Sequence, residues 1–161
     1  LNENMIHPSI ERVADLAEML EEADVVSLHL PAGPKTANMV DADFLASMKK
    51  GAILINTARG ELIVEEELVS AIKRGSLAGA GLDVFRTQPL PQDHPFLTCP
   101  NLVLTPHSAS HTRQAVNTMG QMAADCCLAV RHGRLPQHIC NPDVLNVISD
   151  RDRPAKGNHG L

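Results

Sequence analysis

The stretch Met48–Val64, MKKGAILINTARGELIV, contains the pattern that decides the fold. A glycine at position 51 precedes the apolar run Ala52–Ile55, and the polar group Asn56–Gly60 follows that run. An unbroken apolar run bounded by turn residues is typical of a strand that is buried on both faces. Ligands of open α/β sheets bind outside the carboxyl ends of the strands, so Arg59 is expected where an anion would bind. On position alone, a surface salt bridge is an equally good interpretation of this arginine.

The regions around this stretch alternate between helical and strand patterns. The expected elements, in chain order, are these: a short strand Ile10–Val13, a helix Asp15–Glu22, a strand Asp24–Leu30, a helix from an Asp41 N-cap to Lys50, the strand Ala52–Ile55, a helix from Glu65 to Arg74, strands Leu77–Val84 and Leu102–Leu104, and a helix Ser110–His132. Such alternation predicts an α/β fold with a parallel sheet. Arg59, Asp83 and His107 each follow one of three successive strands, which favours a site over scattered surface charges.

Length and composition restrict the class of protein. The 161 residues suffice for one domain core, and the net charge is −5 with the basic residues scattered along the chain. This distribution gives no nucleic-acid footprint. The apolar runs are too short for a bilayer, and the first residues lack the layout of a signal peptide. We therefore expect a soluble protein without a nucleic-acid or membrane partner.

The four cysteines predict a reducing compartment. No pair among Cys99, Cys126, Cys127 and Cys140 has the two-residue spacing of a zinc or redox motif. We expect free, mostly buried thiols, a cytoplasmic location and no metal site.

Several motifs resemble one known family. These are ADVVSLHLP (Ala23–Pro31), LINTARGEL (Leu54–Leu62), AGAGLDVF (Ala78–Phe85) and LTPHSA (Leu104–Ala109). In their order and spacing they are similar to the D-isomer-specific 2-hydroxyacid dehydrogenases, which include phosphoglycerate, glycerate, lactate and formate dehydrogenases. The resemblance implies part of a Rossmann-like, doubly wound parallel sheet and an NAD(P)-dependent oxidoreductase.

The resemblance also implies roles for particular residues. Arg59 would bind the substrate carboxylate through a two-pronged hydrogen bond. His107 would exchange the hydroxyl proton as general acid and base while a hydride moves to or from the nicotinamide. The substrate class implied is a small 2-hydroxy acid or 2-oxo acid.

For the cofactor, the resemblance implies NAD and leaves NADP open. Asp83 would hold the nicotinamide side, and Pro31, Thr57 and Ala58 would line the dinucleotide. Arg59 and His107 would border the same site. Family members usually dimerise through this domain, so a homodimer is implied as well.

The residue at position 88 departs from the family pattern. The family usually has Asp-Val-Phe, two variable residues and then Glu-Pro, and that glutamate pairs with the catalytic histidine. Here DVFRTQP places Gln88 there. A carboxylate stabilises a protonated imidazole, whereas a neutral amide only orients the ring, which predicts a weaker general base. Formate-type members also have Gln-Pro, and formate oxidation removes no hydroxyl proton. Formate oxidation is therefore an alternative, although LDVF and PHSAS resemble ordinary hydroxyacid members.

The lack of a phosphate-binding turn is a second departure from the family pattern. No Gly-x-Gly-x-x-Gly occurs in the chain, so the first βαβ unit of the Rossmann fold would lie before Leu1. We expect residues 1–148 to be the C-terminal part of a dinucleotide-binding domain with a closing helix and a return segment. Residues 149–161 are expected to be a disordered tail. The chain alone is then expected to be inactive.

A different class of function also fits the two departures. An inactive family fold, or a dimerisation module, would tolerate Gln88 and would need no phosphate-binding turn. The presence of Arg59, Asp83 and His107 opposes this interpretation. Substitution separates the interpretations: if the full-length enzyme keeps its activity after Arg59→Ala, the catalytic assignment fails.

Overall fold

The computed structural model describes residue 7 and residues 9–146. The expected disordered tail, residues 149–161, lies outside the described residues. The chain forms two compact units, Leu1–Ala109 and Ser110–Leu161, and each is described separately below.

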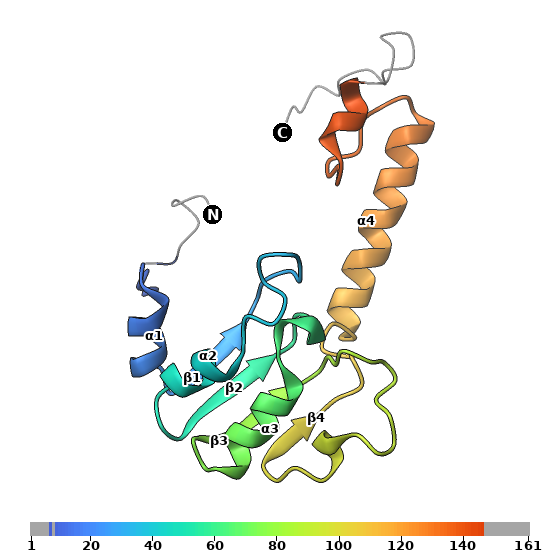
Figure 1. Cartoon of the computed structure of the whole chain (residues 1–161). Helices are drawn as coiled ribbons and strands as arrows, with labels where there is room; N and C mark the ends of the chain where they lie inside the picture. Colours follow the sequence, from blue (N-terminus) through green and yellow to red (C-terminus); the bar gives the residue numbers. More distant parts are fainter. Residues whose placement is uncertain (1–6, 8, 147–161) are drawn as a thin grey trace. The chain divides into compact units, whose positions relative to one another are not determined.

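The first unit is built on a four-stranded parallel sheet (Figure 1). Its strands are β1 (Val25–Leu28), β2 (Ala52–Asn56), β3 (Leu77–Leu82) and β4 (Leu102–Leu104), in the spatial order β1-β2-β3-β4. The register pairs Leu28 with Asn56, Asn56 with Leu82, and Leu82 with Leu104. All four strands therefore end in one row, and the residues that follow them emerge at one edge. The predicted parallel α/β fold is confirmed.

The helices α1 (Leu16–Glu22), α2 (Ala42–Ser47) and α3 (Glu65–Lys73) belong to the same unit. The N-cap predicted at Asp41 is confirmed, because its carboxylate accepts the N–H of Phe44 at 3.0 Å. Helix α2 ends at Ser47, before the two lysines expected in its last turn. The first of them, Lys49, instead forms an exposed ion pair with Asp24 at 2.6 Å.

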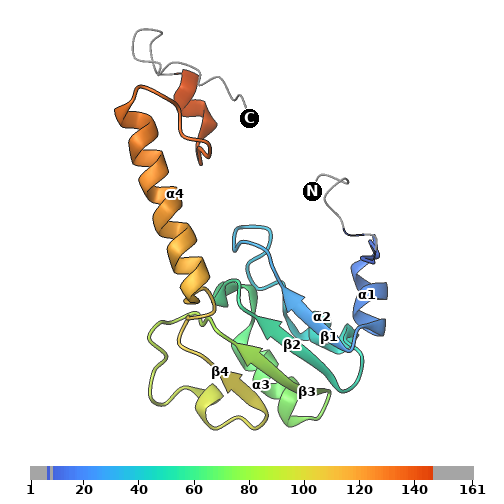
Figure 2. The same cartoon turned by 180° about the vertical axis from the view of Figure 1, so that it is seen from behind.

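The helices pack against one face of the sheet. The core contains Val26, Leu54 and Leu82 from the strands, with Leu45 and Leu68 from α2 and α3. Viewed from behind, the strands lie in front of these helices (Figure 2). The residues of the opposite sheet face are more open to solvent, and they include the exposed large apolar side chains of Val25, Ile53 and Val103.

The expected strand Ile10–Val13 is wrong. These four described residues form no strand, and the side chains of Ile10 and Val13 are exposed. With those side chains unburied, the segment gains nothing from pairing with the sheet. The third strand is also shorter than expected, because β3 ends at Leu82 instead of Val84.

The second unit contains the helix α4 (Arg113–Arg131), close to the expected Ser110–His132. Its N-cap is Thr112, which accepts the N–H of Ala115 at 3.1 Å. A 3-10 turn, η4 (Pro142–Asn146), follows later in the chain. No helix in the described ranges is both long and apolar enough to cross a membrane.

All four cysteines are free, as expected. Their expected burial holds only in part, because Cys99 is buried but Cys127 and Cys140 are exposed. The two exposed thiols belong to the second unit, where no described residue of α4 is buried.

Candidate functional site

The end of β2 carries a turn that sets the position of Arg59. The buried side chain of Asn56 accepts the N–H of Ala58 at 3.0 Å and donates to the carbonyl of Arg59 at 2.8 Å. These bonds replace the sheet ladder at the point where the strand ends. Arg59 is exposed, and one of its Nη1–H groups donates to the carbonyl of Ala58 at 2.7 Å. A guanidinium has five N–H donors, so several are left to bind an anion.

Gly60 brings this turn against a second segment of the site. It begins the 3-10 turn η2 (Gly60–Leu62). A Cβ atom at Gly60 would lie 2.1 Å from the carbonyl carbon of Phe85, 2.3 Å from its oxygen and 2.5 Å from the nitrogen of Arg86. Only glycine therefore allows this approach. The residue after Arg59 is packed directly on the Phe85–Arg86 peptide.

Asp83 follows β3 and is buried. Its Oδ1 accepts the hydroxyl of Thr105 at 2.5 Å and the N–H of Ser108 at 2.9 Å, and its Oδ2 accepts the N–H of Ala109 at 2.9 Å. Burial opposes ionisation, but these hydrogen bonds and the charge of His107 outweigh it and lower the pKa of Asp83 below its ordinary 3.8. The carboxylate thus ties the end of β3 to the segment after β4.

His107 lies within the segment that Asp83 holds. Its backbone φ is 54°, a left-handed conformation that non-glycine residues adopt at a cost on the order of 1 kcal/mol. Its N–H donates to the carbonyl of Thr105 at 3.0 Å, and the next two N–H groups bind Asp83. These bonds hold the tight turn that presents the exposed imidazole.

Gln88 determines which nitrogen of His107 carries the proton. The Nε2 of Gln88 donates to the carbonyl of Phe85 at 3.0 Å, and its Oε1 lies 2.8 Å from Nδ1 of His107. A carbonyl can only accept, so the amide must present its NH₂ to Phe85 and its oxygen to the ring. Nδ1 of His107 must then be the donor. In the neutral ring, Nε2 therefore has the lone pair and is available to a substrate.

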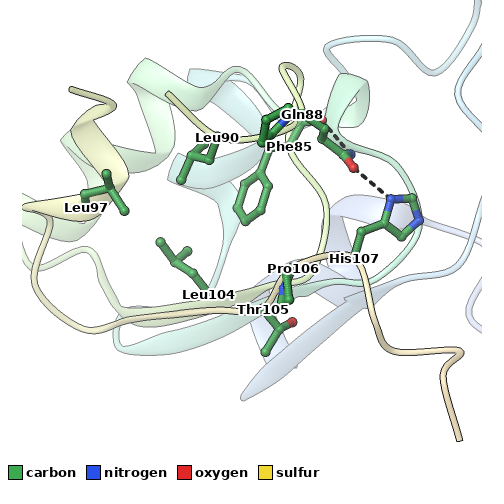
Figure 3. A pocket seen from close by; sticks show the side chains of 9 residues that line it. Phe85, Gln88, Leu90, Leu97, Leu104, Thr105, Pro106 and His107 are labelled. Carbon is green, nitrogen blue, oxygen red and sulfur yellow. Dashed lines mark hydrogen bonds between the residues drawn. The ribbon is translucent and has the colours of Figure 1, made fainter. Parts of the chain in front are cut away.

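A cavity of ≈ 540 Å³ lies beside this pair (Figure 3). Besides Gln88 and His107, its lining residues are Phe85, Pro89, Leu90, Leu97, Leu104, Thr105 and Pro106. Figure 3 shows the ring of His107 directed away from the apolar side chains of Phe85 and Leu90. The cavity is thus largely apolar, with the polar pair Gln88 and His107 in its lining.

The remaining expected site residues also follow strands. Pro31 comes after β1 and is exposed, and Thr57 and Ala58, exposed and half-buried, come directly after β2. Because the four strands end in one row, these residues share an edge of the sheet with Arg59.

Sequence reasoning missed two residues that shape the site. The pattern identifies Asn56 only as a polar residue at the end of an apolar run, although an asparagine there is a frequent signal for a turn closed by its own side chain. Thr105, the hydroxyl partner of Asp83, gave no local signal, because the two residues lie 22 positions apart.

A parallel sheet with polar side chains gathered along its carboxyl edge is the arrangement of nucleotide-binding α/β domains. Residues 2–109 match the family model described as D-isomer specific 2-hydroxyacid dehydrogenase, NAD binding domain. The chain belongs to this family, which confirms the resemblance seen in the sequence.

Individual relatives agree with this assignment. A glyoxylate reductase of Thermofilum pendens is 44% identical over 140 residues, covering 87% of this chain and 41% of that protein. The TT0316 protein of Thermus thermophilus has a TM-score of 0.73 at 48% identity, covering 78% of this chain and 40% of that one. The D-lactate dehydrogenase of Lactobacillus jensenii, solved with NAD+, has a TM-score of 0.73 at 34% identity, covering 80% of this chain and 42% of that one. The chain thus spans less than half the length of these proteins.

Proposed function

We propose that this chain supplies the cofactor-binding and proton-transferring part of an NAD(P)-dependent oxidoreductase. The reaction would interconvert a small 2-hydroxy acid and its 2-oxo acid, and glyoxylate is the first substrate to test because of the Thermofilum relative. The observation that carries the proposal is the imidazole of His107, oriented by Gln88 so that Nε2 is available.

The proposed proton transfer follows from that orientation. In the direction of oxidation, Nε2 of His107 takes the proton of the substrate hydroxyl. In the direction of reduction, the protonated ring returns it to the oxygen of the former carbonyl. Nδ1–H keeps its hydrogen bond to Gln88 in both states. Arg59 would hold the substrate carboxylate with two parallel N–H donors.

The residues after β1 and β2 fit a dinucleotide. Exposed Pro31 and Thr57, with half-buried Ala58, leave the carboxyl edge of these two parallel strands open to a ligand. When bound, the nicotinamide would accept or supply the hydride. We propose that Asp83 supports the nicotinamide side indirectly, because its oxygens are already engaged by Thr105 and the N–H groups after His107.

Formate oxidation is a second candidate, favoured by Gln88. Formate gives up a hydride without a hydroxyl proton, so that reaction needs no general base at His107. The neutral Gln88 amide, which adds no negative charge beside the imidazole, suits this chemistry. Comparing turnover of formate with that of glycolate or glyoxylate decides between the candidates.

The assembly and the location are part of the same proposal. We propose a homodimer, as the family resemblance implies, and sedimentation analysis would test it. A cytoplasmic location is supported by the four free cysteines, since free thiols persist in reducing compartments.

The first experiment is a titration of the chain with NADH, followed by nicotinamide fluorescence. Binding would mean that this part of the fold holds the dinucleotide without a Gly-x-Gly-x-x-Gly turn, whereas no binding agrees with the lack of that turn and leaves the decision to the activity test. The activity itself is best tested in a chimera in which the aligned segment of the Thermofilum pendens glyoxylate reductase is replaced by this chain. We expect the chimera to oxidise NADH in the presence of glyoxylate.

Two substitutions assign the roles within that chimera. Arg59→Ala and His107→Ala should each lower kcat/KM on the order of a hundredfold or more. The matched control is Glu66→Ala, because Glu66 is exposed on α3. Full activity in either site variant would reject the assigned role. A chimera that binds NADH but never turns over any of the acids would support the inactive fold instead.

A further inference from the structure

We propose that Glu65, at the start of α3, is a positioning residue that acts on His107 through one peptide group and Gln88. The inference rests on the proposed function for its catalytic meaning, but the geometry is independent of it. The side chain of Glu65 is only 12% exposed, and its carboxylate faces the segment that carries Gln88.

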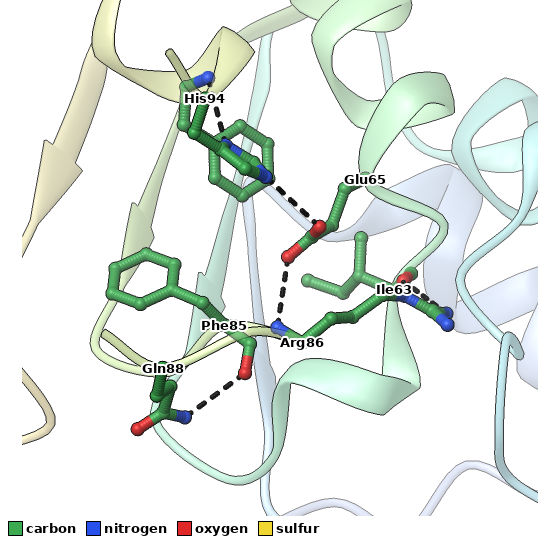
Figure 4. A network of polar contacts seen from close by, with 7 residues as sticks. Ile63, Glu65, Phe85, Arg86, Gln88 and His94 are labelled. Atoms are coloured by element: carbon green, nitrogen blue, oxygen red, sulfur yellow. Dashed lines mark hydrogen bonds and ion pairs between the residues drawn. The ribbon is translucent and has the colours of Figure 1, made fainter. Parts of the chain in front are cut away.

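The two oxygens of Glu65 have different partners (Figure 4). Oε1 accepts the backbone N–H of Arg86 at 3.1 Å. Oε2 lies 3.3 Å from Nε2 of His94, whose side chain is 15% exposed. The imidazole of His94 also packs edge-on against Phe96, with ring centroids 4.7 Å apart. Glu65 is therefore held in one place by the loop on the far side of Arg86.

The side chain of Arg86 forms further hydrogen bonds that hold this residue in place. Its Nε and Nη2 donate to the carbonyl of Ile63 at 2.9 and 2.7 Å, and Nη2 also donates to Oδ1 of Asn38. Backbone and side chain of Arg86 are thus both bound to the segment that leads into α3. The position of Arg86 relative to Glu65 is fixed at two points.

The peptide between Phe85 and Arg86 links Glu65 to Gln88. A trans peptide group is planar, and its N–H and C=O point in opposite directions. Figure 4 shows this arrangement: the N–H of Arg86 meets Glu65, and the carbonyl of Phe85 meets the side chain of Gln88. Fixing the N–H therefore fixes the direction of the carbonyl.

The links form one directed chain of hydrogen bonds. Glu65 accepts from Arg86 N–H, Phe85 C=O accepts from Gln88, and Gln88 Oε1 accepts from Nδ1 of His107. Hydrogen bonds in such chains polarise one another in the same sense. A carboxylate at one end thus favours the Nδ1–H form of His107 at the other, although the ring touches only a neutral amide.

The test is the tautomer of His107, read from the ring nitrogen shifts of the 15N-histidine-labelled chain at a pH where the ring is neutral. We expect the Nδ1–H form to dominate in the wild type. Glu65→Ala should lower the ratio of the Nδ1–H to the Nε2–H form by about fivefold or more, the equivalent of one lost hydrogen bond. Glu65→Gln retains an acceptor for Arg86 and should restore most of the preference.

The control is Glu66→Ala, which changes an exposed carboxylate on the same turn and should leave the tautomer unchanged. If Glu65→Ala does not fold, Glu65→Asp shortens the side chain and carries the same expectation with a smaller shift. A folded Glu65→Ala chain with the wild-type ratio would overturn the proposal, as would a wild type in the Nε2–H form. The tautomer measurement needs no cofactor or substrate, so an inactive chimera would reject the proposed function and leave this result standing.

Discussion

The Nδ1 atom of His107 and the Oε1 atom of Gln88 lie 2.8 Å apart, and the carbonyl of Phe85 sets the direction of the hydrogen bond between them. A neutral amide can therefore select the tautomer of His107, as a carboxylate would. It cannot contribute a negative charge. Asp83, the carboxylate beneath the same turn, is buried, and its oxygens are engaged by Thr105 and by the N–H groups of Ser108 and Ala109.

We expect Gln88→Glu to change the pH dependence of the chimera. A carboxylate here would attract the protonated ring, so the limb of the pH–rate profile that reports His107 should move up by about one pH unit. The profile of kcat/KM for glyoxylate reduction is the measurement. Gln92→Glu, the same change at an exposed position of the same loop, is the control. An unchanged profile would show that the pair does not work as described.

We expect Asp83→Asn to destabilise the chain by about 2 kcal/mol at neutral pH, because hydrogen bonds to a charged acceptor are lost. The folded state lowers the pKa of Asp83, so the ionised group stabilises the fold above 3.8. That stabilisation disappears as the pH falls through the lower pKa of the folded state. Urea unfolding over a pH series should show the gap between wild type and variant closing in acid. A gap that stays constant contradicts the assignment, and Asp93→Asn on the exposed loop is the control.

We expect Gly60→Ala to lower the free energy of unfolding by about 2 kcal/mol or more, since the added methyl group overlaps the Phe85–Arg86 peptide. Gly33→Ala is the matched control, because a Cβ at Gly33 meets nothing within 4 Å. Chemical denaturation of both variants is the measurement. Equal stability of the two would mean that the close contact does not exist in solution.

We expect Val64→Thr to stabilise the chain. Val64 is the N-cap of α3, with φ −82° and ψ 100°, and offers no side-chain acceptor to the first turn. Threonine keeps the shape and adds a hydroxyl that can cap the helix, which is worth about 0.5–1 kcal/mol. Thermal unfolding should show a higher Tm than for Val103→Thr, the same substitution on an exposed strand position. A Tm at or below the wild-type value would exclude a capping gain.

The sequence predicted the features that depend on local patterns. Runs of apolar residues and their boundaries indicate the strand β2 and the helix cap at Asp41. They also place Arg59, Asp83 and His107 after strands. The strand predicted at Ile10–Val13 is wrong, because a short apolar segment has a strand pattern whether or not it pairs with the sheet.

The contacts that connect the site could not be predicted in this way. Glu65 lies 21 residues from Arg86, and nothing in either local pattern indicates that one peptide group connects a helix start to a histidine partner. The burial of Asp83 and its bond to Thr105 likewise depend on β3 and β4 being neighbours in the sheet.

The contact of Gly60 with the Phe85–Arg86 peptide also has a mechanical consequence. With no side chain between them, the backbone after Arg59 and the loop that bears Gln88 are already as close as the two backbones can come. The anion-binding arginine and the partner of the histidine therefore cannot move closer to each other at this contact. The close approach thus sets a lower limit on the spacing between the two groups.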